Sequence, residues 1–172
     1  KKIVSTIILR SGNIIGGGDW AKHRIIPDIV KSFFHKKALI IRNPNHSRPW
    51  QHVLDVIHAI EIIMLSKMNK NVCQKYNIGT MLVKSYTVSD MIKFYKKYFQ
   101  VRIFKSKPIK SIEKESLSIN SKKIFKELNF KNKIGFKEMN ILTASWYKNF
   151  YSNENIIKFT RSQISDYKYY KK

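Results

Sequence analysis

A nearly unbroken apolar run near the start of the chain constrains the fold more than any other feature. Residues 2–9 read KIVSTIIL and are rich in β-branched side chains. Continuous apolar character of this kind is typical of a strand that is covered on both faces of a parallel sheet. Because helices connect and cover the strands of parallel sheets, the run predicts an α/β fold.

A glycine-rich loop follows this strand. Four of the six glycines lie within seven positions, from Gly12 to Gly18. The loop is not a P-loop, since Gly18 and Asp19 stand where a P-loop needs its Lys-Ser/Thr pair. Its Gly-x-x-x-Gly-Gly-Gly spacing is not that of a dinucleotide fingerprint either. Open α/β sheets bind ligands at the carboxyl ends of their strands, and Asn13, Asp19 and Arg24 supply hydrogen-bonding groups of both polarities. We therefore predict a ligand-contacting loop, with a merely flexible loop as the alternative.

A second polar loop, residues 42–52, contains the run Arg48-Pro49-Trp50-Gln51-His52. Pro49 and Trp50 restrict the conformations open to Arg48, and a planar guanidinium suits a diphosphate. On its own this segment is also compatible with a solvated surface arginine.

The rest of the chain alternates between helical and strand patterns. We expect helices at 25–36, 55–68, 87–99, 121–128 and 136–151, and strands at 38–41, 75–78, 101–104 and 117–119. The helix at 55–68 is apolar on most sides, which predicts that it is buried on most sides. Thr87 and Asp90 have the spacing of a capping box, and Asn120 is the expected cap of the next helix. The polar tail from Asp166 to Lys172 is expected to fray.

Composition excludes several classes of protein. The chain has 172 residues, enough for one domain or slightly more, and 43% hydrophobic residues, too many for a disordered chain. The lone Cys73 excludes an internal disulfide and leaves no Cys-based zinc ligand set. No apolar run approaches the length of a membrane span, and the start resembles a strand rather than a signal peptide. These features predict a cytoplasmic protein, and the opening on a hydrophobic strand suggests the later part of something longer.

The charge is strongly positive, with 34 Lys and Arg against 11 Asp and Glu, a net charge of +23. Only six of the 34 are arginine, the residue that nucleic-acid readers favour for paired contacts. Lys, Ile and Asn are enriched together along the whole chain, which indicates a compositional bias. A basic module that binds nucleic acid is the alternative.

The histidines and aromatic residues have no spacing that favours a metal site. His52 is expected to be structural, and Cys73 to have no role. Trp20 is a candidate for stacking on a nucleobase or for packing. Tyr95, Tyr98 and Phe99 share helical spacing and are expected in the core or an interface.

Two segments carry a family resemblance at native spacing. They are RSGNIIGGGDWAKHRIIPDIVKSFF, residues 10–34, and IRNPNHSRPWQHVLDVIHAI, residues 41–60. Both resemble the latter half of the extended short-chain dehydrogenase/reductases, in particular the nucleotide-sugar 4,6-dehydratases that act on CDP-glucose. Weaker similarity continues at 76–79, 117–130, 146–147 and 159–167. The resemblance covers nearly the whole chain but only about the latter half of the family's length.

The resemblance implies a fold and a reaction. The fold would be the last parallel strands of a Rossmann-like sheet plus a smaller mixed α/β substrate-binding lobe. Residues 1–36 would hold the end of the sheet and the substrate loop, and residues 37–172 mainly the lobe. Members bind NAD in an N-terminal half, oxidise the sugar at C4, eliminate water across C5–C6 and return the hydride to C6.

The resemblance also implies roles for individual residues. Ile14 would lie near NAD. The residues that would contact the nucleotide sugar are Asn13, Arg24, Ile25, Leu39, Ile40, Ile41 and Arg48. Of these, Arg48 would bind the diphosphate.

Departures from the family matter for activity. The glycine-rich NAD fingerprint, the catalytic Tyr-x-x-x-Lys and its accompanying Ser/Thr and acidic residues do not occur in family order. A Tyr-x-x-x-Lys does run from Tyr167 to Lys171, but we interpret it as accidental because it lies in the tail. Ile112 stands where the family has an Arg or His.

We therefore predict a chain that binds a nucleotide sugar but is inactive alone. An open sheet edge would invite the missing N-terminal half or a second copy of the chain as a partner. A related nucleotide-sugar epimerase or decarboxylase is the closest alternative.

Overall fold

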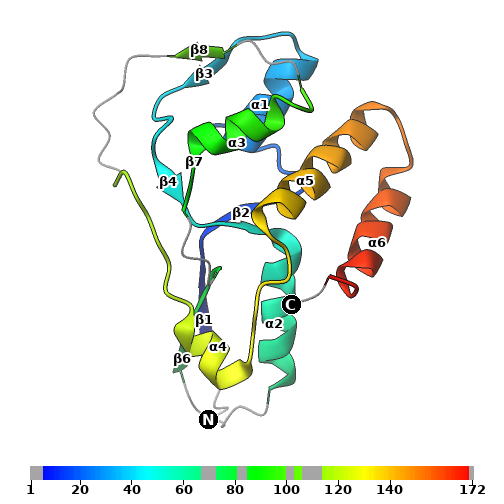
Figure 1. Cartoon of the computed structure of the whole chain (residues 1–172). Helices are drawn as coiled ribbons and strands as arrows, with labels where there is room; N and C mark the ends of the chain where they lie inside the picture. Colours follow the sequence, from blue (N-terminus) through cyan, green and yellow to red (C-terminus); the bar gives the residue numbers. More distant parts are fainter. Residues whose placement is uncertain (1–5, 67–72, 81–84, 100–102, 106–113, 171–172) are drawn as a thin grey trace.

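The computed structural model describes residues 6–66, 73–80, 85–99, 103–105 and 114–170 (Figure 1). The strands are β1 (Thr6–Ser11), β2 (Asn13–Ile15), β3 (Leu39–Ile41), β4 (Ser47–Arg48), β5 (Trp50–His52), β6 (Cys73–Ile78), β7 (Tyr86–Thr87) and β8 (Ile103–Lys105). The helices are α1 (Ile25–Phe34), α2 (Val53–Leu65), α3 (Val88–Tyr95), α4 (Lys122–Leu128), α5 (Phe136–Tyr151) and α6 (Ile156–Tyr167).

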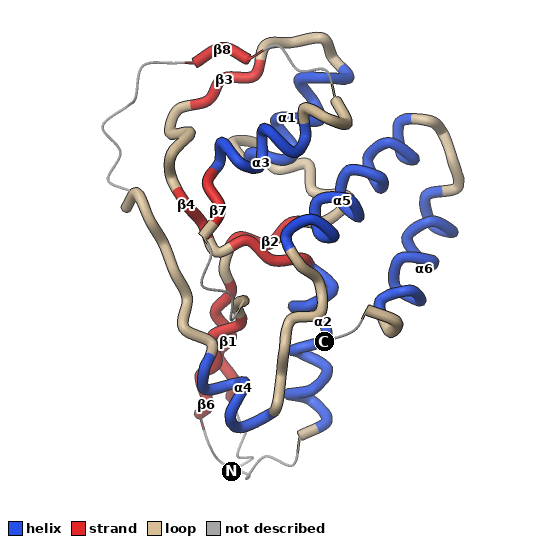
Figure 2. Tube along the Cα trace, in the orientation of Figure 1, coloured by secondary structure: helices blue, strands red, loops and turns tan. Residues whose placement is uncertain are grey.

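Strand pairing is mainly parallel. Strand β1 pairs in parallel with β6, with Thr6 opposite Cys73 at one end and Ser11 opposite Ile78 at the other. The pairs β2–β5 and β3–β8 are also parallel, whereas β4–β7 is antiparallel. Helices lie between the paired strands along the chain, as Figure 2 shows. The predicted α/β class is therefore confirmed.

The core consists of two clusters, which we call the sheet cluster and the aromatic cluster. In the sheet cluster, α2 and α4 pack against the β1–β6 pair. Its buried residues are Val56, Ala59, Ile63, Tyr76, Ile78, Ile124 and Phe130. In the aromatic cluster, α1, α3 and α5 pack together beside β3. Its largest fully buried side chains are Tyr95, Tyr147, Phe99, Ile29, Met91 and Val30.

Buried hydrogen bonds join the two clusters through Asp55 in the first turn of α2. This carboxylate is fully buried and accepts hydrogen bonds from the backbone N–H groups of Lys133 and Ile134, at 2.9 and 3.3 Å. The Asn132 amide and the Tyr167 hydroxyl donate to it at 3.3 and 2.7 Å. One side chain therefore fixes α2, the segment before α5 and the end of α6 to one another.

Most predicted elements form, with shifted ends. The capping box of α3 is also present, because Thr87 and Asp90 exchange hydrogen bonds. Asn120 accepts from the Lys122 N–H at 3.0 Å, although the N-cap position itself is Ser121. The expected strand at 117–119 does not form; only Ser116, one residue earlier, bridges to Ser47. Part of the expected strand at 101–104 lies outside the described residues.

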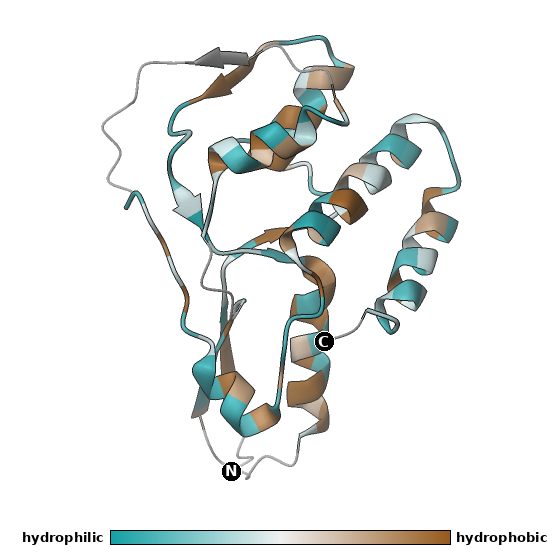
Figure 3. Cartoon of the chain, in the orientation of Figure 1, coloured by the Kyte–Doolittle hydropathy of each residue, from teal (hydrophilic) through white to brown (hydrophobic). Residues whose placement is uncertain are grey.

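Three further expectations about burial or order were wrong. The predicted two-sided burial of the first strand is not seen, because β1 alternates exposed and half-buried residues. The predicted burial of the second helix on most sides is not seen either, since Ile57, Ile60 and Met64 of α2 are exposed. Figure 3 shows hydrophobic, brown stretches along α2. The expected fraying of the tail does not extend to Tyr167, which α6 presents to Asp55.

Candidate functional site

The glycine-rich loop and the Arg48 loop lie side by side. Their strands, β2 and β5, pair in parallel with Asn13 opposite Trp50, and the Asn13 N–H donates to the Pro49 carbonyl at 2.9 Å. A Cβ at Gly12 would lie 2.1 Å from that same carbonyl oxygen, so only glycine permits this approach. The two loops that the sequence singled out are therefore adjacent.

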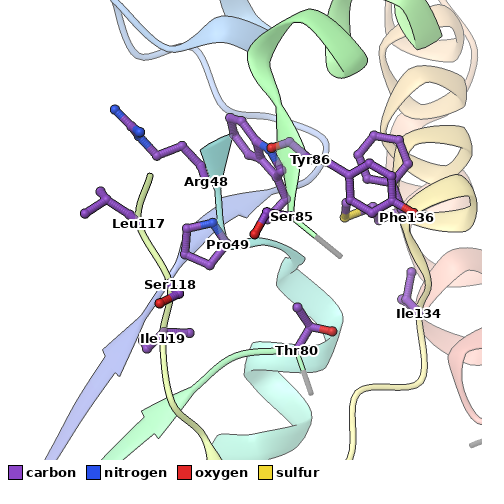
Figure 4. Close-up of a pocket in the computed structure, with 12 residues that line it drawn as sticks. Arg48, Pro49, Thr80, Ser85, Tyr86, Leu117, Ser118, Ile119, Ile134 and Phe136 are labelled. Atoms are coloured by element: carbon purple, nitrogen blue, oxygen red, sulfur yellow. The ribbon is translucent and has the colours of Figure 1, made fainter. Parts of the chain in front are cut away.

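A pocket opens beside the second loop (Figure 4). It encloses about 560 Å³ of empty space, part of it open to solvent. Its walls combine apolar side chains with four hydroxyl-bearing residues. The lining residues are Arg48, Pro49, Trp50, Thr80, Ser85, Tyr86, Leu117, Ser118, Ile119, Ile134, Phe136 and Met139.

Arg48 is held firmly at the rim of this pocket. It is only 9% exposed, and its Nη1 donates to the carbonyls of Ser47, Lys114 and Glu115 at 2.8, 3.2 and 3.3 Å. Its Nη2 lies 3.1 Å from His46 Nδ1. Figure 4 shows the guanidinium pointing away from Pro49. A guanidinium fixed in this way loses little entropy when it meets an anion, as the sequence suggested.

Arg24 lies at the other side of the glycine-rich loop. It is the N-cap residue of α1, its side chain is 62% exposed, and it pairs with Asp19 at 3.3 Å. Further along, Arg42 Nη2 lies 3.1 Å from His23 Nδ1. Partial burial raises the pKa of Asp28, in the first turn of α1, against the lowering effect of His23, Lys31 and Arg42. This end of α1 is therefore rich in charge and open to solvent.

The remaining predicted contact residues lie in different surroundings. Ile14 is 37% exposed and Ile40 is 66% exposed. Leu39 and Ile41 are buried in the aromatic cluster, and Ile25 begins α1 half-buried. Of the predicted set, only Arg48 lines the described pocket, whereas Asn13 and Arg24 do not.

The sequence did not reveal the opposite wall of the pocket. The rings of Tyr86 and Phe136 are stacked with centroids 3.6 Å apart, and Trp50 Nε1 donates to the Tyr86 carbonyl at 2.9 Å. Thr80 directly follows residues 76–79, one of the segments with weaker family similarity, but Phe136 comes from the distant helix α5. Tyr86 and Phe136 lie 50 residues apart along the chain, so no periodic pattern in the sequence links them.

His52 and Trp20 are structural. His52 caps α2 by accepting from the Leu54 N–H at 3.3 Å, and burial lowers its pKa to about 4. Trp20 packs against Tyr147 and Phe150, with centroid separations of 5.3 and 5.0 Å. Packing therefore explains Trp20 without a nucleobase.

The described residues hold no group of three or more His, Cys, Asp or Glu side chains placed to bind a metal ion. In the same part of the chain, no helix combines the length and the apolar character that crossing a bilayer requires.

Comparison with known families finds a match for the first part of the chain. Residues 1–79 match the NAD dependent epimerase/dehydratase family. The matched segment includes both loops and all the residues for which the resemblance implied a ligand contact.

One curated protein is similar over a short stretch. The CDP-glucose 4,6-dehydratase of Salmonella typhimurium is 54% identical over 55 residues, which are 32% of this chain and 15% of the relative. The match therefore involves a small part of a much longer protein.

Solved structures match over most of the chain at low identity. UDP-glucose 4-epimerase of Thermotoga maritima, solved with UDP-glucose, has a TM-score of 0.71 at 19% identity, covering 84% of this chain and 46% of that one. The dTDP-glucose 4,6-dehydratase of Bacillus anthracis, solved with NAD, has a TM-score of 0.69 at 22% identity, covering 83% and 44%. These likenesses confirm a Rossmann-like fold. The chain spans less than half the length of either structure.

Proposed function

We propose that this chain is the nucleotide-sugar-binding part of an NAD-dependent sugar-nucleotide 4,6-dehydratase, and that its substrate is CDP-glucose. The observation that carries the proposal is the fixed Arg48 guanidinium, on the loop whose Pro49 carbonyl accepts from Asn13 of the glycine-rich loop, within the segment that matches the epimerase/dehydratase family. The choice of CDP-glucose is supported by the stretch shared with the Salmonella dehydratase.

The proposed ligand spans both loops. The diphosphate lies at Arg48, where the guanidinium is held by three carbonyls. The nucleoside lies toward Arg24, Ile25 and β3, whose Ile40 side chain faces solvent. Asn13 contacts the sugar from the first loop. In this division, residues 1–36 hold the end of the sheet and the substrate loop, and residues 37–172 are mainly the substrate-binding lobe.

NAD belongs to the complete protein. The residues present here do not form a dinucleotide site, because the sequence has no glycine fingerprint and offers only the exposed Ile14 at the expected position. When bound, NAD supplies hydride transfer, while the residues of this chain bind and orient the nucleotide sugar. We propose that the chain is inactive alone and that the complete enzyme works in the cytoplasm.

Calorimetric titration of the purified chain with CDP-glucose, UDP-glucose and dTDP-glucose tests the binding proposal. We expect CDP-glucose to bind most tightly, and Arg48→Ala to weaken binding at least tenfold, or about 1.4 kcal/mol. Arg48→Lys retains the charge without the planar fork and should give an intermediate result. Arg161→Ala removes the same charge from α6 and should leave the affinity unchanged.

The outcomes separate the candidate functions. A preference for UDP-glucose would support a related epimerase instead. Binding to random RNA that exceeds sugar-nucleotide binding and weakens steeply with salt would support the nucleic-acid alternative. Conversion of CDP-glucose to a 4-keto-6-deoxy product by the chain and NAD alone would contradict its proposed inactivity.

A further inference from the structure

The glycine-rich loop rests on an indole ring from a distant helix. A Cβ atom at Gly17 would overlap Cγ, Cδ1 and Cδ2 of Trp146 in α5, so only glycine lets the backbone approach the ring this closely. Gly18 lies near the other end of the same ring, where a Cβ would be 3.5 Å from Trp146 Cη2. The backbone of these two residues therefore runs along the indole.

The next residue of α5 holds the following part of the loop. The hydroxyl of Tyr147, which is fully buried, donates to the Asp19 carbonyl at 2.6 Å. The Asp19 carboxylate accepts from the Ala21 N–H at 3.0 Å and pairs with Arg24 at 3.3 Å. Two adjacent residues of α5 therefore fix the segment that carries Arg24, one of the proposed contacts of the nucleotide sugar.

The orientation of Trp146 is set by α6, which packs beside α5 (Figure 1). Trp146 Nε1 donates to Thr160 Oγ1 at 2.8 Å, and this hydroxyl donates its own proton to the Ile156 carbonyl at 2.7 Å. Three residues further along α6, Gln163 donates to the Leu142 carbonyl of α5 at 2.9 Å. The hydrogen bond from the indole to α6 therefore fixes the direction in which the ring edge points.

The glycine at position 17 shows that this ring does more than fill space. Gly17 does not adopt the left-handed conformation that Gly18 has at φ +81°, so its lack of a side chain is required by the contact with Trp146. A ring that only filled space could pack against loop side chains, which adjust by changing rotamer. A ring that touches the backbone at two successive residues moves the loop whenever it moves.

We propose that Trp146 is a positioning residue for nucleotide-sugar binding and that Thr160 acts through it. The indole supports the glycine-rich loop in the conformation in which Asn13 and Arg24 reach the ligand, and the Thr160 hydroxyl keeps the indole in place. Neither Trp146 nor Thr160 lines the pocket beside Arg48. The inference rests on the proposed function, because the affinity for a nucleotide sugar is what these residues are proposed to control.

Calorimetric titration of the full chain with CDP-glucose tests the role of Thr160. Thr160→Val keeps the volume of the side chain but removes the hydroxyl, so the affinity should fall about three- to tenfold, the range for one hydrogen bond. Thr160→Ser restores the hydroxyl and should bind like the parent chain. Ser162→Ala removes an exposed hydroxyl that donates to the Phe159 carbonyl on the same helix, and it should have no effect.

A double-variant cycle tests the contact between the ring and the loop. Gly17→Ala forces the loop away from the indole and should weaken binding about tenfold. Trp146→Ala removes the support of the loop and should weaken binding to a similar extent. Because Trp146→Ala also removes the ring that the new methyl group would meet, the double variant should bind no more weakly than Trp146→Ala alone. Additive losses would overturn the inference.

Two measurements without ligand distinguish positioning from general loss of structure. Thr160→Val should melt within about 4 °C of the parent chain, the shift expected when a chain of this length loses one hydrogen bond. Amide exchange in residues 12–22 should become about threefold faster or more, because the loop is released. A larger fall in the melting temperature, or failure of Thr160→Ser to restore the affinity, would contradict the positioning role.

Binding and exchange together separate this inference from the proposed function. If the parent chain binds CDP-glucose and Thr160→Val binds it equally well, the positioning role is wrong and the proposed function stands. If the parent chain binds none of CDP-glucose, UDP-glucose and dTDP-glucose, the proposed function fails. The exchange of residues 12–22 then decides whether Thr160 and Trp146 fix the loop, and unchanged exchange in Thr160→Val overturns that as well.

Discussion

The aromatic cluster and the sheet cluster differ in how completely their apolar side chains are buried. The aromatic cluster encloses Tyr95, Phe99 and Tyr147, each at most 1% exposed. The sheet cluster rests on a two-stranded parallel pair, and both β1 and α2 retain apolar side chains facing outward. Closed packing can stabilise a cluster by itself, whereas an open cluster depends on what covers it. The difference predicts that equal mutations have unequal effects in the two regions.

The largest expected effect is in the aromatic cluster. Phe99→Ala removes a ring that packs against Phe33 and Tyr95, with centroid separations of 5.2 and 6.1 Å. We expect a loss of about 3–5 kcal/mol in the free energy of unfolding, measured by urea titration. Phe130→Ala, at a site 2% exposed in the sheet cluster, should cost less, because the open cluster relaxes around the cavity. Equal losses would contradict the distinction between the two clusters.

Asp55 tests the connection between the clusters. Asp55→Ala leaves two backbone N–H groups and the Tyr167 hydroxyl without their buried acceptor. We expect a loss of about 3–4 kcal/mol and early loss of α6 protection in hydrogen exchange.

The matched controls are Tyr167→Phe and Asp166→Ala. Tyr167→Phe removes only the bond from α6 and should cost about 1 kcal/mol. Asp166→Ala removes an exposed carboxylate from the same helix and should change little. If Asp55→Ala costs no more than Asp166→Ala, the carboxylate does not join the clusters.

His52 makes stability depend on pH at the start of α2. Burial lowers its pKa from 6.5 to about 4 in the folded chain. Between these values the unfolded chain binds more protons, so folding is favoured fully above pH 6.5 and progressively less as the pH falls toward 4. The predicted loss over this range is about 3 kcal/mol.

His52→Asn keeps a side chain that can cap the helix but removes the titration. We expect the stability of the variant, followed by urea titration between pH 4 and 7, to show a shallower slope than that of the parent chain. Identical slopes would show that the His52 ring does not resist protonation in the folded state.

The sequence predicted local features well because their causes are local. The spacing of Thr87 and Asp90 is sufficient for a capping box. The need for glycine at Gly12, in contrast, comes from the backbone of Pro49 in the other loop and could not be derived from local sequence. The stacking of Tyr86 on Phe136 joins two segments through tertiary packing and leaves no periodic signal. The exposure of Ile57 was predicted wrongly, because apolar character shows that a face can be covered but not by what.

The smallest predicted effects compare two helix caps. Thr87 caps α3, which buries Met91 and Tyr95 in the aromatic cluster, while Asn155 caps α6, which has no fully buried residue. Thr87→Ala should cost about 1 kcal/mol in global unfolding, because α3 cannot fray without opening the cluster. Asn155→Ala should change global unfolding by only a few tenths of a kcal/mol and instead raise amide exchange in the first turn of α6. Lys93→Ala, on the exposed side of α3, controls for helix propensity. A loss of global stability for Asn155→Ala as large as that for Thr87→Ala would mean that α6 unfolds together with the aromatic cluster. In that case α6 would have to be counted as part of that closed cluster.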